Sequence, residues 1–473
     1  MTRSVLDDMN AAYPEDATEI SAGVRSGRVS AVETIERARA RHEAQSDLNA
    51  FTHESWAAAE RAAVELDRRR RAGDDVGPLA GVPVSVKDVI AVAGLPITAG
   101  SRALMGTTAR ATATAVRRLQ DAGAIVVGKS NCPEFAFGVT CESPLQGRTL
   151  NPRFPDVTPG GSSGGDAALL AAGITALGIG TDFGGSLRWP AQCTGTVSIR
   201  PTAGFVPTAG QVPAAGGDVG ATGRLVDVSP GMQGRLQVVG PLARSIRDLR
   251  TALAVMAGRA ADSVDVGDFD PSALRVAWSD GGALGPVRRE VSDRVAKVAE
   301  AAAGRGATAI ERPRLFEGCL PAYNALRAVD PMRDHAAVVA GREHLLLPEN
   351  LQTIRASLVT TPAELAAAEL AAADSARAAL RIFDEVDVVL LPVAGGPACD
   401  HDGTLAVDGV VVRGWELMGA CRAVTLTGAP AVSVPVGRSE EGLPLSLQVV
   451  CAPGRDGRAL AVAEWLASMC EAE

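Results

Sequence analysis

The sequence has 473 residues, of which 47% are hydrophobic and 21% are charged. This composition is ordinary for a globular protein and excludes a largely disordered or fibrous chain. The net charge of −9 argues against nucleic acid as a partner, because phosphate binding needs concentrated positive charge. The sequence contains no stretch of 18 apolar residues free of charge, so we expect no membrane partner and a cytoplasmic protein.

The first 75 residues have a helical pattern. Thr18, Ser30 and Ser55 each open a segment whose apolar residues recur at helical spacing. We therefore expect residues 1–75 to form a helical arm packed against the rest of the chain.

Beyond residue 75, short apolar runs alternate with helical segments such as 111–122, which indicates an α/β sheet. The expected strands cover residues 82–86, 124–127, 175–182, 386–391, 431–436 and 445–450. The late strands resemble the early ones, so we expect them to complete one sheet. Between them, residues 257–385 are dominated by Ala-rich helices, including one over 361–382.

Residues 158–187 are the segment richest in glycine. Gly160–Gly164 matches the G-x-S-x-G pattern of a nucleophile elbow, but Pro155 and Pro159 disfavour the strand that must lead into it. The Gly-Lys-Ser/Thr ending of a nucleotide-binding loop is absent. The segment instead predicts a glycine loop entering a helix, then a buried strand, then a tight turn entering a second helix.

The second turn, residues 183–186, ends in a serine at the start of a helix. Backbone N–H groups of such a turn are free to point together at an oxyanion, and the helix N-terminus favours negative charge there. Ser186 is therefore the candidate nucleophile. It requires a base, and Lys87 at the end of the predicted strand 82–86 is the candidate.

Lysine is rare in this chain. Lys87, Lys129 and Lys297 are the only lysines, so 43 of the 46 basic residues are arginine. A buried amine can become neutral near pH 7, whereas a guanidinium group cannot. A lysine retained against this background is a candidate for proton transfer, although for Lys129 we favour a structural role or one that supports the site indirectly.

Taken together, these motifs resemble the amidase signature family. The resembling segments are residues 81–88, 98–101, 128–131, 133–135, 159–190, 240–244, 391–392 and 428–431. Lys87 precedes Ser162 by 75 residues and Ser162 precedes Ser186 by 24, separations similar to those between the lysine and the two serines of that family. Asp166 departs from the pattern, since family members often have serine there.

The resemblance implies a triad in which Ser186 forms the acyl-enzyme, Ser162 relays protons after a cis Gly161–Ser162 peptide bond, and Lys87 is the neutral base. The implied oxyanion-hole amides are those of Phe183, Gly184, Gly185 and Ser186, with Ser163, Asp182 and Arg188 in supporting positions. The resemblance also implies one large catalytic domain over residues 76–473, with a mixed central sheet covered by helices on both faces. Residues 257–385 would form a variable substrate region within it, and no cofactor or metal is required.

The expected reaction is hydrolysis of a carboxylic amide, with aryl amides and carbamates as candidate substrates, by a monomer or homodimer. The alternatives are a carbamate or ester hydrolase on the same triad, and a glutaminase-type subunit of an amidotransferase complex. Residues 204–207, Gly-Phe-Val-Pro, lack the Gly-Arg-Val-Ser usual in that subunit. Phe135, Phe137 and Val139 are candidate pocket residues, and their apolar character suggests an uncharged substrate.

Overall fold

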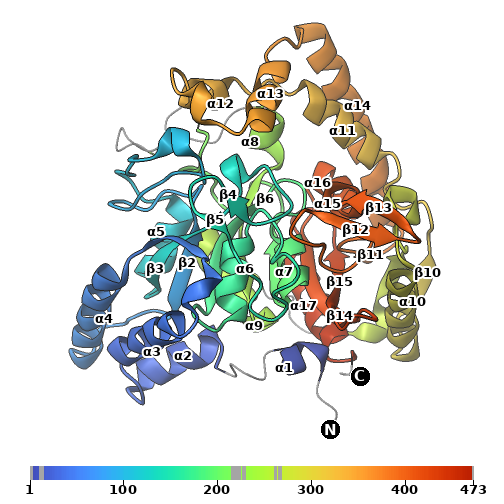
Figure 1. Ribbon diagram of the computed structural model, residues 1–473. Coiled ribbons are helices and arrows are strands. Elements are labelled where there is room, and N and C mark those ends of the chain that lie inside the picture. Colours follow the sequence, from blue (N-terminus) through green and yellow to red (C-terminus); the bar gives the residue numbers. More distant parts are fainter. Residues whose placement is uncertain are drawn as a thin grey trace.

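The computed structural model describes residues 4–9, 15–214, 225, 231–259, 264 and 269–470. Within them, eleven strands form one twisted sheet at the centre of the molecule (Figure 1). In spatial order the strands are β1 (Phe51–Glu54), β3 (Ile125–Ser130), β2 (Pro83–Lys87), β6 (Leu177–Asp182), β8 (Val238–Ala243), β7 (Val197–Arg200), β14 (Ala431–Arg438), β15 (Pro444–Val450), β11 (Val388–Pro392), β9 (Arg275–Trp278) and β10 (Thr308–Glu311).

The sheet is mixed. Strands β3, β2 and β6 run parallel to one another, as do β11, β9 and β10. The strands between these two groups pair antiparallel. The late strands thus complete the sheet begun by the early ones, as expected, and the joining strands β8, β7, β14 and β15 hold the two parallel groups together.

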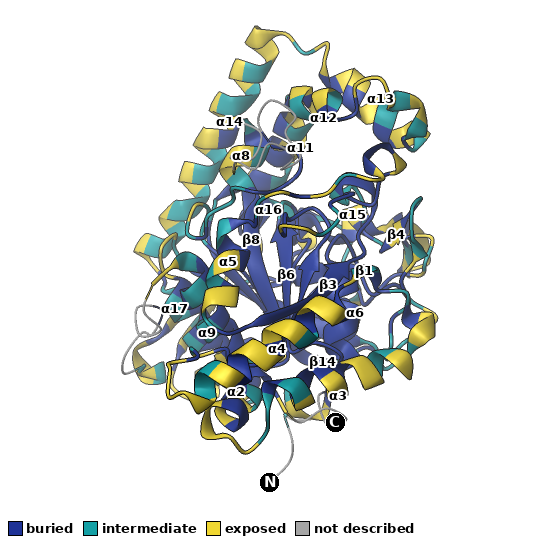
Figure 2. Cartoon of the chain, turned by 90° about the vertical axis from the view of Figure 1, so that its left-hand side faces the viewer, coloured by how far each residue is buried: buried dark blue, intermediate teal, exposed yellow. Residues whose placement is uncertain are grey.

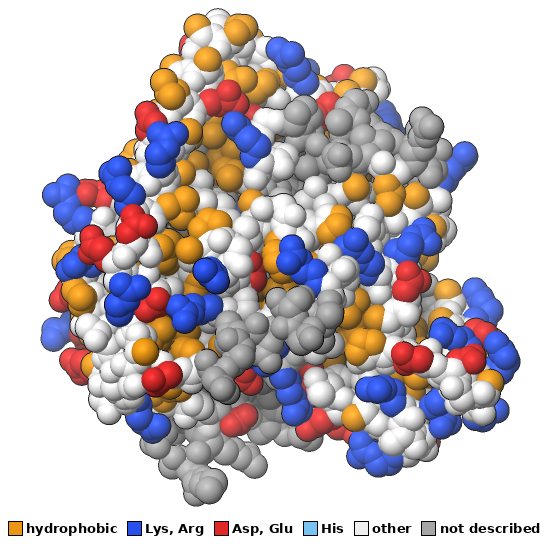
Figure 3. Space-filling view, turned by 180° about the vertical axis from the view of Figure 1, so that it is seen from behind, with side chains coloured by type: hydrophobic (Ala, Val, Ile, Leu, Met, Phe, Trp, Pro, Cys, Tyr) orange, Lys and Arg blue, Asp and Glu red, His pale blue; other side chains and the backbone are white. Residues whose placement is uncertain are grey.

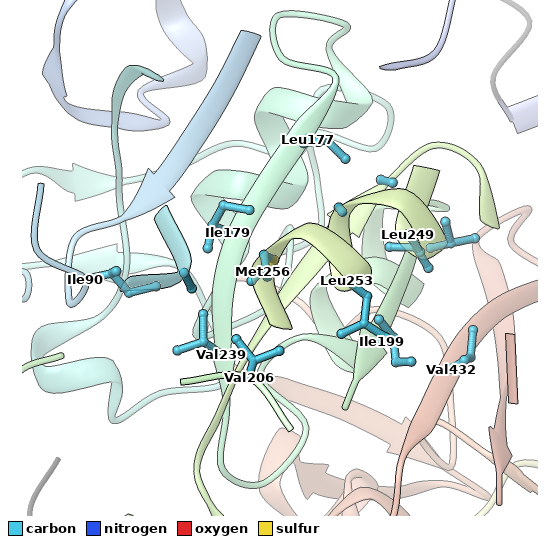
Figure 4. Close-up of a cluster of buried hydrophobic side chains, with 14 of the residues drawn as sticks. Ile90, Leu177, Ile179, Ile199, Val206, Val239, Leu249, Leu253, Met256 and Val432 are labelled. Carbon is cyan, nitrogen blue, oxygen red and sulfur yellow. The ribbon is translucent and has the colours of Figure 1, made fainter. Parts of the chain in front are cut away.

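Helices cover both faces of the sheet. One face is covered by α5 (Thr114–Asp121), α9 (Ile246–Ala257), α10 (Arg289–Gly304) and α17 (Asp456–Ala467). Figure 4 shows Leu249, Leu253 and Met256 of α9 packed toward Ile199 and Val239 on the strands beneath. The opposite face carries α6 (Gly164–Ala171) and α7 (Arg188–Thr194), the helices that follow the two glycine turns.

The N-terminal segment forms α1 (Val5–Met9), α2 (Ala17–Ser26), α3 (Ala31–Glu43) and α4 (Trp56–Arg71). Ser30 caps α3 as predicted, in a reciprocal capping box with Glu33. The helix expected at Thr18 starts one residue earlier, because the Asp16 carboxylate accepts the N–H of Glu19 while the Thr18 hydroxyl donates to Asp248. Strand β1 lies between α3 and α4 and pairs with β3, so this segment also contributes the edge of the central sheet.

Helix α5 is shorter than the 111–122 predicted. The Thr112 hydroxyl accepts the N–H of Ala93, and the N–H of Ala113 donates to Ala91 O. These bonds hold residues 112–113 against a neighbouring loop, so the helix begins only at Thr114.

Within the region 257–385, β9 and β10 are strands of the central sheet and α10 covers it, although the sequence indicated mainly helices there. The part of the region between residues 319 and 380 rises above the sheet at the top of Figure 1. It contains α11 (Cys319–Val329), α12 (Arg333–Val338), α13 (Pro348–Ser357) and α14 (Pro362–Leu380), and nearby lie α8 (Met232–Leu236), α15 (Gly414–Leu417) and α16 (Gly419–Leu426). Two small hairpins, β4 (Glu142–Ser143) with β5 (Gly147–Arg148) and β12 (Thr404–Val407) with β13 (Val410–Arg413), complete the fold. Figure 2 shows α14 largely exposed and the central strands fully buried.

The surface seen from behind mixes both signs of charge. In Figure 3, blue basic and red acidic side chains are interspersed across the described part of that face, with no broad area of one sign. None of the described helices is both long enough and apolar enough to cross a membrane.

Candidate active site

Two glycine turns meet at one edge of the sheet. Strands β2 and β6 are parallel neighbours, so their carboxyl ends lie side by side, Lys87 at one and Asp182 at the other. Open α/β sheets bind ligands at this edge. The turn before α6 contributes Ser162 and the turn before α7 contributes Ser186, and Ser163 N–H donates to Ser186 O (3.2 Å), which joins the two turns.

Lys87 is fully buried among hydroxyl groups. Its Nζ donates to Ser162 Oγ (2.6 Å), Thr181 Oγ1 (2.9 Å) and Ser163 Oγ (3.1 Å). Lys87 has no carboxylate within ion-pair distance among the described residues. Burial lowers the pKa of Lys87 from 10.5 to about 8, against the opposing pull of acidic side chains that include Asp166. A large fraction of this amine is therefore neutral at mildly alkaline pH.

Ser162 and Ser186 line one cavity. The peptide bond between Gly161 and Ser162 is cis, as the resemblance implied. Ser162 is 1% exposed and Ser186 is 8% exposed, and both side chains border the cavity. In the described part of the chain Ser162 accepts the Lys87 hydrogen bond, whereas Ser162 and Ser186 form no hydrogen bond with each other. The structure thus contains the hydrogen bond between Lys87 and Ser162 that a proton relay needs, and it places Ser186 at the same cavity as Ser162.

The turn over residues 183–186 presents backbone N–H groups at the start of α7. Within the described residues, the amides of Phe183, Gly184 and Ser186 donate to no other group. The prediction for Gly185 is wrong, because its N–H donates to Asp182 Oδ1 at 2.8 Å. Gly185 serves the turn in another way: its φ is +121°, and an added Cβ would lie 2.6 Å from Met418 Cε.

Asp182 and Arg188, both implied as supporting residues, form an ion pair beneath this turn. The guanidinium donates from Nη2 to Asp182 Oδ1 (2.9 Å) and from Nε to Oδ2 (3.0 Å), and both side chains are fully buried. Burial acts to raise the pKa of Asp182, but the charges of Arg188 and Arg200 and the hydrogen bonds outweigh it and hold that pKa at about 2. The carboxylate remains ionised and fixes the turn through the amides of Gly185 and Leu187.

Sequence reasoning missed Tyr323, which holds the turn from above. Its hydroxyl, on α11, donates to Phe183 O at 2.9 Å. Residue 323 lies in the region where the motifs of the sequence are weakest, and no local pattern marks it. Lys129 is buried in an ion pair with Asp88 (3.1 Å) and does not line the cavity, in keeping with a structural role.

The cavity has a volume of about 40 Å³. Phe135 and Phe137 line it, as predicted, but Val139 does not: it packs against Trp189, whose indole N–H donates to Val139 O. The rest of the lining comes largely from α8, α11, α12 and the adjoining loops, with Gln233, Gln237, Arg327, Asp330, Pro331, Met332 and His335. The region that the sequence left unassigned therefore supplies one wall. Among the described residues no group of three His, Cys, Asp or Glu side chains could hold a metal ion.

Comparison with known proteins was made in sequence and in structure. A family model described as Amidase matches residues 33–460. The chain is 33% identical over 465 residues to an indoleacetamide hydrolase of Bradyrhizobium diazoefficiens, covering 94% of this chain and 84% of that protein. It is 33% identical over 489 residues to a glutamyl-tRNA(Gln) amidotransferase subunit of Deinococcus radiodurans, covering 95% and 96%. A crystal structure of an amidase superposes with a TM-score of 0.86 at 29% identity, over 96% of this chain and 100% of that chain.

Proposed function

This chain belongs to the amidase signature family and is a hydrolase that acts on amides, and from that premise we propose that it works through an acyl-enzyme on Ser186, with Ser162 as proton relay and Lys87 as base. The observation that carries the proposal is the 2.6 Å hydrogen bond between Lys87 Nζ and Ser162 Oγ in a fully buried site. Such a site favours the neutral amine that a base must be.

In the proposed reaction, Lys87 takes a proton from Ser162 as Ser162 takes one from Ser186. The Ser186 oxygen attacks the amide carbon, and the amides of Phe183, Gly184 and Ser186 bind the resulting oxyanion. Ser162 then gives a proton to the leaving nitrogen and regains one from Lys87, so the C–N bond breaks and an amine leaves. Water attacks the acyl-enzyme by the same relay, which releases the carboxylate and restores Ser186.

We propose that the protein acts alone on a small-molecule amide, as a monomer or homodimer. The similarity to an amidotransferase subunit favours the glutaminase alternative. That activity requires a second protein chain, however, and residues 204–207 read Gly-Phe-Val-Pro instead of the Gly-Arg-Val-Ser usual in that subunit. Carbamates and esters could enter the same mechanism. Amide, carbamate, ester and glutamine hydrolysis by the purified chain would separate these activities.

The test of the mechanism is Ser186→Ala. This variant should lose amide turnover by several orders of magnitude and should no longer be labelled by a fluorophosphonate, because no other group can accept the acyl chain. Ser162→Ala should also lose turnover but retain slow labelling, since the nucleophile remains. Labelling and turnover that persist at the wild-type level in Ser186→Ala would refute the proposal.

A further inference from the structure

Two basic side chains lack polar partners in the cavity wall that α8, α11, α12 and the adjoining loops form. Arg327 lies near the end of α11 and His335 lies in α12, and both line the cavity that Ser162 and Ser186 share. The His335 ring is 2% exposed, yet neither Nδ1 nor Nε2 has a hydrogen-bond partner. Arg327 donates no hydrogen bond and forms no ion pair within the described residues.

The contacts that these side chains do make are with aromatic rings. The Arg327 guanidinium lies over Phe137, 5.5 Å from the ring centroid, and His335 packs against Phe135 and Phe137 at 5.8 and 5.1 Å. A ring occupies only one face of a guanidinium group, whose N–H donors point outward in its own plane. The rings therefore hold both bases in place without using their hydrogen bonds.

One acidic side chain shares this part of the cavity. Asp330 lies beyond ion-pair distance of Arg327 and accepts the N–H of Met232 at 3.1 Å, so its charge attracts Arg327 without occupying the N–H donors of that side chain. Burial lowers the pKa of Arg327, and burial together with the nearby Arg327 charge holds the pKa of His335 at about 3. This part of the cavity thus holds one half-buried cation, Arg327, and one fully buried neutral imidazole, His335, whose ring nitrogens have no partner. Unpaired buried polar groups are costly and rare, and a ligand that pairs with them relieves that cost.

We propose that Arg327 and His335 bind a carboxylate on the substrate, so that the enzyme acts on amides that carry a second, anionic group, such as monoamides of short dicarboxylic acids. A planar guanidinium matches a carboxylate, and Arg327, His335 and both serines line one cavity, which favours a short link between the amide and the anionic group. This inference rests on the proposed function. It replaces the uncharged substrate that Phe135 and Phe137 alone suggested.

The test compares matched amides. The values of kcat/KM are measured for malonamate, succinamate and glutaramate, and for neutral amides in which an isopropyl group replaces each carboxylate. At least one anionic amide should exceed its neutral match by about 10- to 100-fold, the size of a charge-assisted hydrogen bond. Arg327→Met keeps the stem packing and should reduce that ratio to near one, while Arg327→Lys should retain part of it. His335→Leu should lower it less, since only a neutral donor is lost.

Arg333→Met is the matched control, because Arg333 is exposed at the start of the neighbouring helix α12, and it should leave the ratio unchanged. A second readout needs no turnover: the dicarboxylate of the preferred chain length should slow fluorophosphonate labelling of Ser186 in the wild type but not in Arg327→Met. If no anionic amide is preferred, or if Arg327→Met and Arg333→Met behave alike in both readouts, the inference is overturned. If Ser186 is neither labelled nor needed for turnover, the proposed function fails instead.

Discussion

Burial of Lys87 makes a lysine base possible and also sets the pH range in which it works. Desolvation lowers its pKa to about 8, although Asp166 and Asp182 pull in the opposite direction. Around it stand three hydroxyl oxygens rather than carboxylates. Hydroxyl groups favour the charged amine less than carboxylates would, and each can also donate, so when Lys87 is neutral its lone pair can accept the proton of Ser162 while its two N–H groups donate to the other two oxygens.

Lys87→Arg should be nearly as damaging to amide hydrolysis as Lys87→Ala, because a guanidinium group cannot become neutral. Wild-type activity should rise as pH increases through about 8, where the amine loses its proton. Ester hydrolysis should suffer less, since an ester leaving group depends less on protonation by the relay. Amide and ester rates across pH for the three proteins check this, and an arginine variant with wild-type amide rates would contradict it.

Asp166 offers a way to move this pH dependence. It is fully buried, its Oδ1 accepts from Ser85 Oγ (2.6 Å), and burial raises its pKa to about 6. Above that pH its negative charge raises the pKa of Lys87. Asp166→Asn keeps an acceptor for Ser85 but removes the charge, so the rise of activity with pH should shift to lower pH. A pH–rate profile that does not move would show that Asp166 has no electrostatic role in the site.

At the scale of elements, the site depends on two helices that begin where the glycine turns end. Helices α6 and α7 both start at the edge of the sheet where β2 and β6 end. Gly165, in the first turn of α6, could not be larger, because a Cβ there would lie 2.5 Å from Asn131 O. The close approach of α6 to that loop fixes the preceding turn, and with it Ser162, above Lys87.

Helix α11 supports the oxyanion turn through one hydrogen bond, from Tyr323 to Phe183 O. Tyr323→Phe should lower kcat for amides by roughly 5- to 10-fold, the effect of about 1 kcal/mol from a neutral hydrogen bond, with little change in KM. Steady-state kinetics on a neutral amide measure both constants. A change confined to KM would indicate that Tyr323 contacts the substrate rather than the turn.

At the scale of the whole molecule, Arg188 joins the early part of the central sheet to its late part. Besides Asp182 at the end of β6, it donates to Gln448 on β15 (2.7 Å) and to Thr425 on α16 (2.9 Å). The same contacts that hold the oxyanion turn therefore connect the early and late parts of the chain. Arg188 therefore contributes both to the stability of the fold and to the geometry of the oxyanion turn.

Arg188→Met should lower the free energy of unfolding by roughly 3–5 kcal/mol, because it removes the closer of the two buried guanidinium groups that pair with Asp182 and leaves only Arg200, at 3.7 Å. Arg314→Met, which breaks an exposed pair with Glu317, should change the free energy of unfolding far less, because solvent screens the pair. Denaturant unfolding of both variants measures the difference. The folded-state pKa of Asp182, about 2, lies below its ordinary 3.8, so its contribution to stability is present above pH 3.8 and is lost as pH falls through 2. Equal stability of the two variants would contradict this role.

The sequence by itself determined the family, the class of reaction and the candidate triad of Lys87, Ser162 and Ser186. These residues lie in local motifs whose glycines and helix starts follow from short-range rules. It also predicted the single sheet, because alternation of apolar runs marks strands wherever they lie in the chain. Asp182 and Arg188 were named as supporting residues from the same motif, but their ion pair was seen only in the structure.

Only the tertiary structure decided how that site is completed. Tyr323, Arg327 and His335 come from helices more than a hundred residues beyond Ser186, and their sequence neighbours carry no pattern that marks a cavity wall. Likewise, the N–H of Gly185 donates to a carboxylate instead of facing an oxyanion, and Val139 turns toward Trp189. Each of these outcomes depends on packing between elements distant in sequence, and local periodicity carries no information about such contacts.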